Sequence, residues 1–289
     1  MNMSNDKKPE RRPGQKKDWK KDQGSRGGKP RGQFRKDYPR RAPRPPVEGR
    51  ANLWGTHAVS EAWLNPARQI AALYITDVML KNFEPTLAQG KELKRPSPKI
   101  MDRKDMDRML GEGVVHQGIA IDAKPLDEVF VQDFIARAAN LDHALLLMLD
   151  QVTDPHNAGA ILRSASAFGA AGVIMQRRHS PELTGVLAKT ASGAIEHVPV
   201  AYEINLSDTL DYLKNKGFYA IGLDERGETA IGAIKKGGKT VLVLGAEGKG
   251  LRPKVAEHCD TLARLPTQGP INSLNVSNAA AVALYALSK

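Results

Sequence analysis

The sequence has little of what disulfide-stabilised, membrane-spanning or metal-binding proteins need. One cysteine, Cys259, stands in 289 residues, which excludes an internal disulfide and is typical of a reducing compartment such as the cytoplasm. Apolar runs such as Ala144 to Leu149 are far too short to span a bilayer, so we expect no membrane partner. No second histidine or cysteine stands at ligand spacing from His116, so we expect no metal ion. His116 is then a structural or RNA-contacting residue.

Acidic and basic residues are unevenly distributed along the chain. The net charge of +11 arises entirely in residues 1–50, which hold 17 basic and 6 acidic residues. These residues are nearly free of aliphatic side chains and rich in Pro and Gly, which predicts a disordered basic tail. Flexible cations interspersed with Trp19, Phe34 and Tyr38 favour RNA as a partner, because cations neutralise phosphates and aromatic rings stack on bases. A solubilising tail is the alternative interpretation.

The remaining chain divides into a small α/β domain at residues 51–123, a linker helix at 124–142 and a larger domain at 143–289. In the small domain we expect strands at 53–55, 70–75 and 114–121, helices at 57–65 and 102–110, and a loop at 81–99. In the larger domain we expect strands at 144–149, 172–176, 198–201, 218–223 and 241–244, with helices at 157–168, 183–192 and 206–215 and a terminal helix capped by Ser277. This alternation predicts a parallel sheet covered on both faces, with ligands beyond the carboxyl ends of its strands.

Three polar motifs follow predicted strands. The first runs from Asp154 to Arg163, and Asp154 before Pro155 marks a helix start. Arg163 points away from the core face of that helix, where it either contacts phosphate and ribose or is simply solvated. The second is the glycine-rich loop Gly245–Leu251, in which Glu247 is either a polar anchor or a solvated turn residue. The third is the loop Leu265–Ser277, which leads into an alanine-rich helix.

Together these motifs resemble the SpoU/TrmH-type RNA 2′-O-ribose methyltransferases of the SPOUT class. The matching stretches are Asn157–Arg163, Leu244–Leu251 and Ser273–Ser277, in the order and spacing of that family. The resemblance implies an α/β fold whose C-terminal SPOUT domain has a parallel sheet and a deep trefoil knot, a homodimer, and S-adenosyl-L-methionine as cofactor. It implies a catalytic set made of Asn157, Arg163, Glu247, Ser273 and Asn275, and cofactor contacts at Gly245, Gly248, Leu265 and Leu274.

The N-terminal stretches Trp54–Val59 and His116–Gly118 resemble the substrate-binding domain of the RlmB-like branch. That resemblance implies methylation of a guanosine in large-subunit rRNA. Two alternatives are open, namely a tRNA 2′-O-methyltransferase and a non-catalytic RNA-binding factor in ribosome assembly. The first is disfavoured by the additional N-terminal domain, and the second by the intact polar set.

Overall fold

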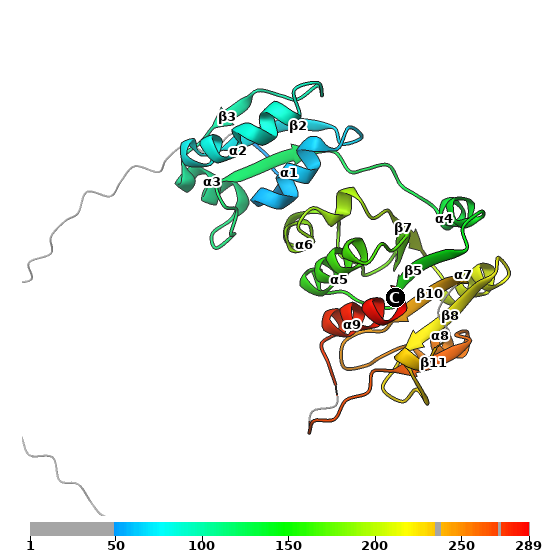
Figure 1. The fold of residues 1–289 in the computed structure, drawn as a ribbon. Helices are drawn as coiled ribbons and strands as arrows, with labels where there is room; N and C mark the ends of the chain where they lie inside the picture. Colours follow the sequence, from blue (N-terminus) through cyan, green and yellow to red (C-terminus); the bar gives the residue numbers. More distant parts are fainter. Residues whose placement is uncertain (1–48, 235–237, 271–272, 289) are drawn as a thin grey trace, which may run out of the picture. The chain divides into compact units, whose positions relative to one another are not determined.

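We describe the chain from a computed structural model, which covers residues 49–234, 238–270 and 273–288 (Figure 1). The predicted basic tail at residues 1–50 lies outside the described residues, apart from its last two positions. Residues Pro46–Lys289 form one compact unit, which contains two β-sheets. Within the described ranges, no helix is long and apolar enough to cross a lipid bilayer.

The smaller sheet has four strands in the order β1-β4-β2-β3, in which only β2 and β3 are parallel. Its elements are β1 (Leu53–Trp54), α1 (Thr56–Leu64), β2 (Ile70–Ile75), α2 (Asp77–Gln89), β3 (Pro98–Ile100), α3 (Arg103–Leu110) and β4 (Ile119–Ala123). Trp63 of α1 and Phe83 of α2 are both buried and meet edge to face, with ring centroids 6.3 Å apart. Aromatic pairs of this geometry add stability beyond the area they bury, so they help to fix the two helices on this sheet.

Helix α2 and strand β3 occupy much of the segment 81–99, so the prediction of a loop there was wrong. Pro85 lies inside α2, although proline removes a backbone donor and usually ends a helix. The helix forms because the Thr76 side chain accepts the Met79 N–H at 3.3 Å and Phe83 is buried beneath it. Strand β4 begins at Ile119, five residues later than predicted, because a turn precedes it.

His116 holds that turn. Its side chain is buried, and its Nδ1 accepts the Gly118 N–H at 3.0 Å. The proton must therefore be on Nε2, which donates to Asp107 Oδ1 at 2.9 Å. Gln117 has a φ of +60° and accepts the Thr56 N–H on its side chain at 2.9 Å. The structural interpretation of His116 is thus confirmed, since a ring buried in this way is not available to a ligand.

The larger sheet has seven strands in the order β7-β6-β5-β10-β8-β11-β9, and every neighbouring pair is parallel. Its strands are β5 (His143–Leu149), β6 (Gly172–Gln176), β7 (Val200–Glu203), β8 (Phe218–Leu223), β9 (Thr229–Ala230), β10 (Gly238–Leu244) and β11 (Thr261–Arg264). The helices are α4 (Val131–Ala138), α5 (Pro155–Ala167), α6 (Gly185–Thr190), α7 (Leu206–Lys214), α8 (Pro253–Glu257) and α9 (Val276–Ser288), with 3-10 turns at Ala194–Glu196 and Ile231–Ala233. The predicted parallel sheet is confirmed.

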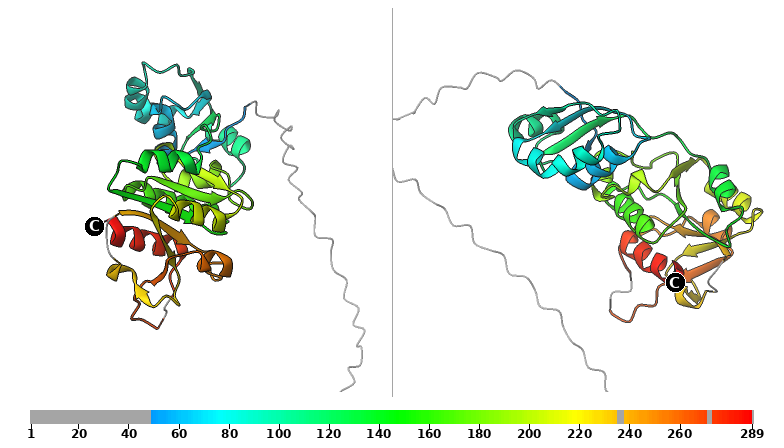
Figure 2. Two further views of the ribbon diagram at one scale, coloured as in Figure 1. Left: turned by 90° about the vertical axis from the view of Figure 1, so that its right-hand side faces the viewer. Right: turned by 45° about the horizontal axis from the view of Figure 1, so that its top comes forward.

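Both faces of this sheet are buried. Along β5, Leu147 and Leu149 pack in the cluster that contains residues of α5, α6 and α9. Leu146 and Met148 pack in the cluster that contains residues of α4, α7 and α8. Successive side chains of a strand point to opposite faces, so the two clusters are the two sides of the sheet. Figures 1 and 2 show the helices as layers on either side of the strands.

Several predicted bounds in this region were too wide or incomplete. The predicted linker helix 124–142 is helical only in α4, and β9, α8 and β11 were missed. Elements of two to five residues show no hydrophobic period, so a pattern of side chains cannot find them. The predicted domain boundaries and the trefoil knot stay predictions.

Cys259 is a structural residue. Its Sγ lies 3.4 Å from the Val255 carbonyl oxygen, at the end of α8. Burial raises the pKa of the Cys259 thiol to about 12, and the neighbouring Asp260 carboxylate adds to the shift. The reactive thiolate is therefore absent near neutral pH.

A buried ion pair joins α1 and its following turn to the 3-10 turn before β7. Arg68 Nη2 lies 2.7 Å from Glu196 Oε1, and the two side chains are only 5% and 0% exposed. Asn65 also donates to Glu196 Oε2 at 2.8 Å, and Arg68 Nη1 donates to the Lys124 carbonyl at 2.8 Å. A buried charge without its partner is costly, so these contacts fix the sequence-distant segments to each other.

We expect Arg68→Ala to lower the free energy of unfolding by about 3–5 kcal/mol, because it leaves the Glu196 carboxylate buried and unpaired. Urea denaturation measures this loss. The matched control is Arg177→Ala, whose partner Glu128 is 44% exposed, with an expected loss of about 1 kcal/mol or less. Removing both charges in Arg68→Met/Glu196→Gln should cost less than Arg68→Ala alone. Equal losses for Arg68→Ala and the control would contradict this account.

Candidate active site at the carboxyl ends of the large sheet

The three central strands of the large sheet end at the same level. Leu244 of β10 pairs with Leu149 of β5 on one side and with Leu223 of β8 on the other. Ala263 of β11 pairs with Leu223 in turn. Because parallel strands present their carboxyl ends at one edge, the loops that follow them converge there. All three polar motifs of the sequence lie in loops or helix starts at this edge.

The glycine-rich loop after β10 folds back on itself. The Ala246 and Gly250 backbones exchange two hydrogen bonds, of 3.1 and 2.9 Å. A Cβ added to Gly245 would stand only 2.1 Å from the Gly250 carbonyl carbon, so no side chain fits at that position. Gly248 has a φ of +76°, which favours glycine. The glycine-rich loop is thus a tight turn, and it carries Glu247 between its two hydrogen-bonded ends.

Glu247 is exposed, and its carboxylate also makes hydrogen bonds to two other segments of the chain. Its Oε2 accepts from Asn157 Nδ2 at 3.0 Å and from Asn275 Nδ2 at 3.4 Å. The two amides are themselves linked, because Asn275 Nδ2 also donates to Asn157 Oδ1 at 3.0 Å. Three residues that are far apart in the sequence therefore form one hydrogen-bonded set, which we call the polar cluster.

The direction of every hydrogen bond in the polar cluster is fixed by the start of α9. Asn275 Oδ1 accepts from the Ser277 N–H at 2.9 Å and from the Ser277 hydroxyl at 2.6 Å. This orientation turns Asn275 Nδ2 toward Asn157 and Glu247, and it leaves Asn157 Nδ2 to donate to the carboxylate. Glu247 is therefore an acceptor in both of its contacts.

Asn275, and not Ser277, caps the terminal helix. Helix α9 begins at Val276, and the Asn275 carbonyl accepts the Ala279 N–H at 2.9 Å. The predicted cap at Ser277 was therefore wrong, because its hydroxyl donates to Asn275 instead of accepting from the helix.

The predicted start of α5 is confirmed, since Asp154 accepts from His156 and Asn157 N–H at 3.1 and 3.3 Å, with Pro155 as the first helical residue.

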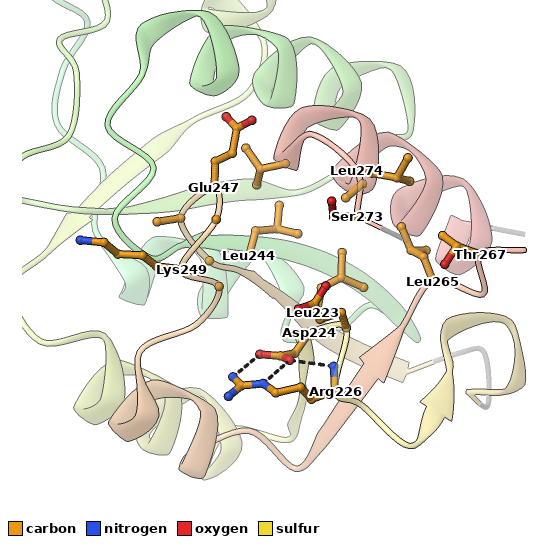
Figure 3. A pocket seen from close by; sticks show the side chains of 17 residues that line it. Leu223, Asp224, Arg226, Leu244, Glu247, Lys249, Leu265, Thr267, Ser273 and Leu274 are labelled. Carbon is orange, nitrogen blue, oxygen red and sulfur yellow. Dashed lines mark hydrogen bonds and ion pairs between the residues drawn. The ribbon is translucent and has the colours of Figure 1, made fainter. Parts of the chain in front are cut away.

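A cavity of about 640 Å³ opens beside the polar cluster (Figure 3). Its lining comes from the loops after β8, β10 and β11 and from the start of α9. The lining residues include Leu223, Asp224, Arg226, Leu244, Gly245, Glu247, Gly248, Lys249, Leu265, Thr267, Ser273, Leu274 and Val276. A cavity of this volume, lined by leucines and a few charged side chains, is typical of a small-ligand site. The predicted cofactor contacts Gly245, Gly248, Leu265 and Leu274 all belong to this lining.

The predicted catalytic residues do not all meet at the cavity. Glu247 and Ser273 line it, and Asn157 and Asn275 reach it through Glu247. Arg163 lies on α5, is exposed as the sequence predicted, and is not a lining residue. Among the described residues it has no hydrogen-bonding or ion-pair partner, so nothing in the described chain holds it at the cavity.

Asp224 and Arg226 form an ion pair at the cavity that the sequence analysis missed. Asp224 Oδ1 accepts from Arg226 Nε at 2.8 Å and from the Arg226 N–H at 2.9 Å, and Oδ2 accepts from Nη2 at 2.8 Å. Hydrogen bonds from Arg226 hold the pKa of Asp224 below its usual value, although burial opposes this shift. The available signal was an Asp-x-Arg-Gly sequence directly after a buried strand, which is typical of an Asp-led turn.

Asp150 is a second carboxylate near the site that the sequence did not single out, and it holds in place the segments on which the site is built. It is fully buried, and it accepts from Arg252 Nε at 2.7 Å and from the Arg252 N–H at 3.0 Å. The Asp150 N–H donates to the Leu244 carbonyl at 2.8 Å. These contacts tie the end of β5 to the end of β10 and to the start of α8, which fixes both ends of the glycine-rich loop.

Two family models match this chain. One, described as RNA 2′-O ribose methyltransferase substrate binding, matches residues 53–129. The other, described as the SpoU rRNA Methylase family, matches residues 144–285. The first match covers the smaller sheet, and the second covers the larger sheet with all three polar motifs.

A protein of Mycolicibacterium smegmatis, named an uncharacterized tRNA/rRNA methyltransferase, is 42% identical to this chain over 188 residues. That match covers 65% of this chain and 60% of the relative, so the chain spans about three fifths of the length of the curated relatives it matches.

Solved structures share the fold. The SpoU methyltransferase AviRb from Streptomyces viridochromogenes, solved with AdoMet, has a TM-score of 0.67 at 23% identity, over 82% of this chain and 88% of that one. An AdoMet-bound rRNA methyltransferase from Sinorhizobium meliloti has a TM-score of 0.66 at 21% identity, over 82% and 86%. Both family models are SpoU models, and together they match residues 53–129 and 144–285, so the chain belongs to the SpoU family.

Proposed function

We propose that this protein methylates a ribose 2′-hydroxyl in RNA, with S-adenosyl-L-methionine as methyl donor. The polar cluster of Asn157, Glu247 and Asn275 at the edge of a ligand-sized cavity is the observation that carries the proposal. Methyl transfer requires a donor in a pocket and polar groups that orient the acceptor hydroxyl against it. Family membership and the names of the relatives support RNA as the acceptor.

The cavity fits the cofactor in chemistry. Leu223, Leu244, Leu265 and Leu274 provide apolar walls for an adenosyl group, and the Glu247 carboxylate suits a positively charged sulfonium. Gly245, Gly248, Leu265 and Leu274 would hold it, mainly through backbone groups. When bound, the cofactor supplies an electrophilic methyl group and a neutral thioether leaving group.

The polar cluster orients the ribose. The Oε2 atom of Glu247 accepts from two amides, and its second oxygen can accept from a hydroxyl. Asn157 is held by α5 and Asn275 by the start of α9, so neither must be ordered when RNA binds. Ser273 adds a hydroxyl at the cavity. Together these groups would align the 2′-oxygen with the methyl group.

Arg163 would act on the RNA rather than as a base. A guanidinium holds its proton very tightly, which makes it a poor proton acceptor. Its planar fork instead suits a phosphate next to the reacting ribose and stabilises developing alkoxide charge. The hydroxyl proton would leave to phosphate or water. Because Arg163 does not line the cavity of its own chain, RNA or a second protomer must bring it to the reaction.

A homodimer is part of the proposal, and α9 supplies the surface that supports it. Val282 and Tyr285 of α9 are 48% and 49% exposed, and Phe168 packs against the Tyr285 ring with centroids 6.0 Å apart. Ala280 is fully buried within its own protomer, so it supports the core, whereas Ala281 is only partly covered. An exposed apolar stripe on a small-residue helix suits close contact with a second copy.

The proposed substrate is a guanosine of large-subunit rRNA. The substrate-binding match at residues 53–129 and the resemblance to the RlmB-like branch support it. A tRNA target is the second candidate, since the relative from Mycolicibacterium smegmatis is named for both RNA classes. A non-catalytic factor is disfavoured because the polar cluster is held together by hydrogen bonds beside the cavity.

Mapping 2′-O-methyl sites in total RNA, with and without this protein, tests the function. We expect one site in large-subunit rRNA to disappear and to return with the wild-type gene. Complementation with Asn157→Ala should not restore it, because this variant removes one of the two donors to Glu247. A lost tRNA site would select the second candidate, and an unchanged map would contradict the enzyme proposal.

We expect Arg163→Ala to lower kcat by about 10²-fold or more, because it removes charge stabilisation in the transition state. Arg163→Lys should recover little of this loss, since lysine keeps the charge and loses the fork. Transfer of radiolabelled methyl groups to RNA measures both. Arg178→Ala is the control, because Arg178 is also exposed but belongs to neither the cavity nor the polar cluster. Activity near wild type in Arg163→Lys would exclude the bidentate role.

We expect Val282→Arg to shift the protein from dimer to monomer, because a charge cannot be buried unpaired in an apolar contact. Light scattering after size-exclusion chromatography measures the mass. The matched control is Val78→Arg on α2, where an exposed valine is replaced in the same way outside α9. A mass unchanged by Val282→Arg would place the dimer contact elsewhere or exclude it.

A further inference from the structure

We propose that Arg226 recognises the α-carboxylate of the cofactor, and that Asp224 positions Arg226 for this task. The inference rests on the proposed cofactor site and adds a specificity-determining residue to it. It assigns a role to the loop after β8, which none of the three polar motifs includes.

The loop after β8 is a tight turn set by Asp224. The Asp224 N–H donates to the Ala263 carbonyl of β11 at 2.9 Å, which anchors the residue to the sheet. Its carboxylate accepts the Arg226 N–H, and its carbonyl accepts the Gly227 N–H at 3.0 Å. The Asp224 side chain is only 3% exposed, and a Cβ on Gly250 would stand 3.5 Å from its Oδ2. The Asp224 carboxylate therefore lies buried between its own turn and the glycine-rich loop.

Arg226 is held by that carboxylate and yet open to the solvent. Its Nε and Nη2 both donate to Asp224 at 2.8 Å, and its side chain is 70% exposed. A guanidinium has five N–H bonds, so three remain outside this ion pair. A long side chain that is already fixed loses less entropy when it binds a ligand. Arg226 is therefore a preorganised cation at the cavity.

The other cation of the cavity lining is not fixed in this way. Lys249 lies on the glycine-rich loop, and its side chain is exposed. No ion pair of Lys249 is found within the part of the chain that the structure describes. A flexible ammonium would have to be ordered on binding, and it is a point charge rather than a planar fork. Arg226 is for these reasons the better partner for a carboxylate.

The cavity has a carboxylate, Glu247, and a guanidinium, Arg226, at separate places in its lining. Figure 3 shows Glu247 and Arg226 on different sides of the cavity, with Leu223 and Leu244 between them. S-adenosylmethionine carries a positive sulfur, and its α-carbon bears an ammonium group beside a negative carboxylate. A carboxylate against a fixed guanidinium makes short, charge-assisted hydrogen bonds. A sulfonium near Glu247 and an α-carboxylate near Arg226 would each lie against a group of opposite charge.

An RNA phosphate is the less favoured partner of Arg226. The reacting ribose must lie at the polar cluster, which is built from α5, the glycine-rich loop and the start of α9. The phosphates on either side of a ribose are covalently close to it and remain on that side. Arg226 comes from the loop after β8, on the other side of the cavity.

Isothermal titration calorimetry on the full chain tests the inference with two ligands. One is S-adenosylmethionine, and the other is its decarboxylated form, which lacks only the carboxylate. We expect Arg226→Ala to weaken binding of the first by about tenfold or more and to leave binding of the second unchanged. Asp224→Asn should give a smaller loss with the same selectivity, because it loosens Arg226 without removing it.

Arg177→Ala is the control, because Arg177 also pairs with a carboxylate but lies outside the cavity. It should bind both ligands as the wild type does. Unchanged binding of S-adenosylmethionine by Arg226→Ala overturns the inference, and so does an equal loss for both ligands, which would mean that the ion pair only shapes the loop. A selective loss in Lys249→Ala, with none in Arg226→Ala, would assign the carboxylate to the other cation. If the wild type binds neither ligand, the proposed cofactor site itself fails.

Discussion

The parallel register of β10 with its two neighbours is the constraint on which the candidate site depends. Leu244 lies opposite both Leu149 and Leu223, so three chain segments leave the sheet at one level. Asp150, Asp224 and Gly245 are the next residues in those segments, and each one starts a structure that the site uses. A strand displaced by one residue would turn these side chains to the other face of the sheet, because side chains alternate along a strand.

Most of the larger sheet could be predicted because its strands are continuous apolar runs such as Val241–Leu244. A strand buried on both faces needs apolar side chains at every position, and this pattern is easy to recognise. Helix α2 could not be predicted, because Pro85 breaks the helical signal that the buried Phe83 would otherwise give. β11 pairs with β8 over only a few residues, so its existence depends on a neighbour and not on its own sequence.

The candidate site was predictable to the extent that its residues follow strands or start helices. Glu247 could be recognised because it lies in a glycine-rich loop. Glycines such as Gly245 have no room for a side chain, so the backbone can pack closely around the carboxylate-bearing residue. The two amides had no local signal that they would meet, because Asn157 and Asn275 are 118 residues apart. The resemblance to a family supplied that pairing. Asp224 and Arg226 were not found, because a carboxylate that binds its own turn looks like an ordinary polar loop in a sequence.

The strand order has a consequence for how the chain folds during synthesis. β5 lies between β6 and β10, and the contact between Gly238 and His143 joins residues 95 positions apart. At about 5–20 residues per second, a ribosome needs on the order of 5–20 s to make the segment between them. Throughout this interval β5 has an open hydrogen-bonding edge flanked by leucines, which is the kind of surface that pairs with other chains. Helices that pack early on β5 would therefore lower the chance of such pairing until β10 emerges.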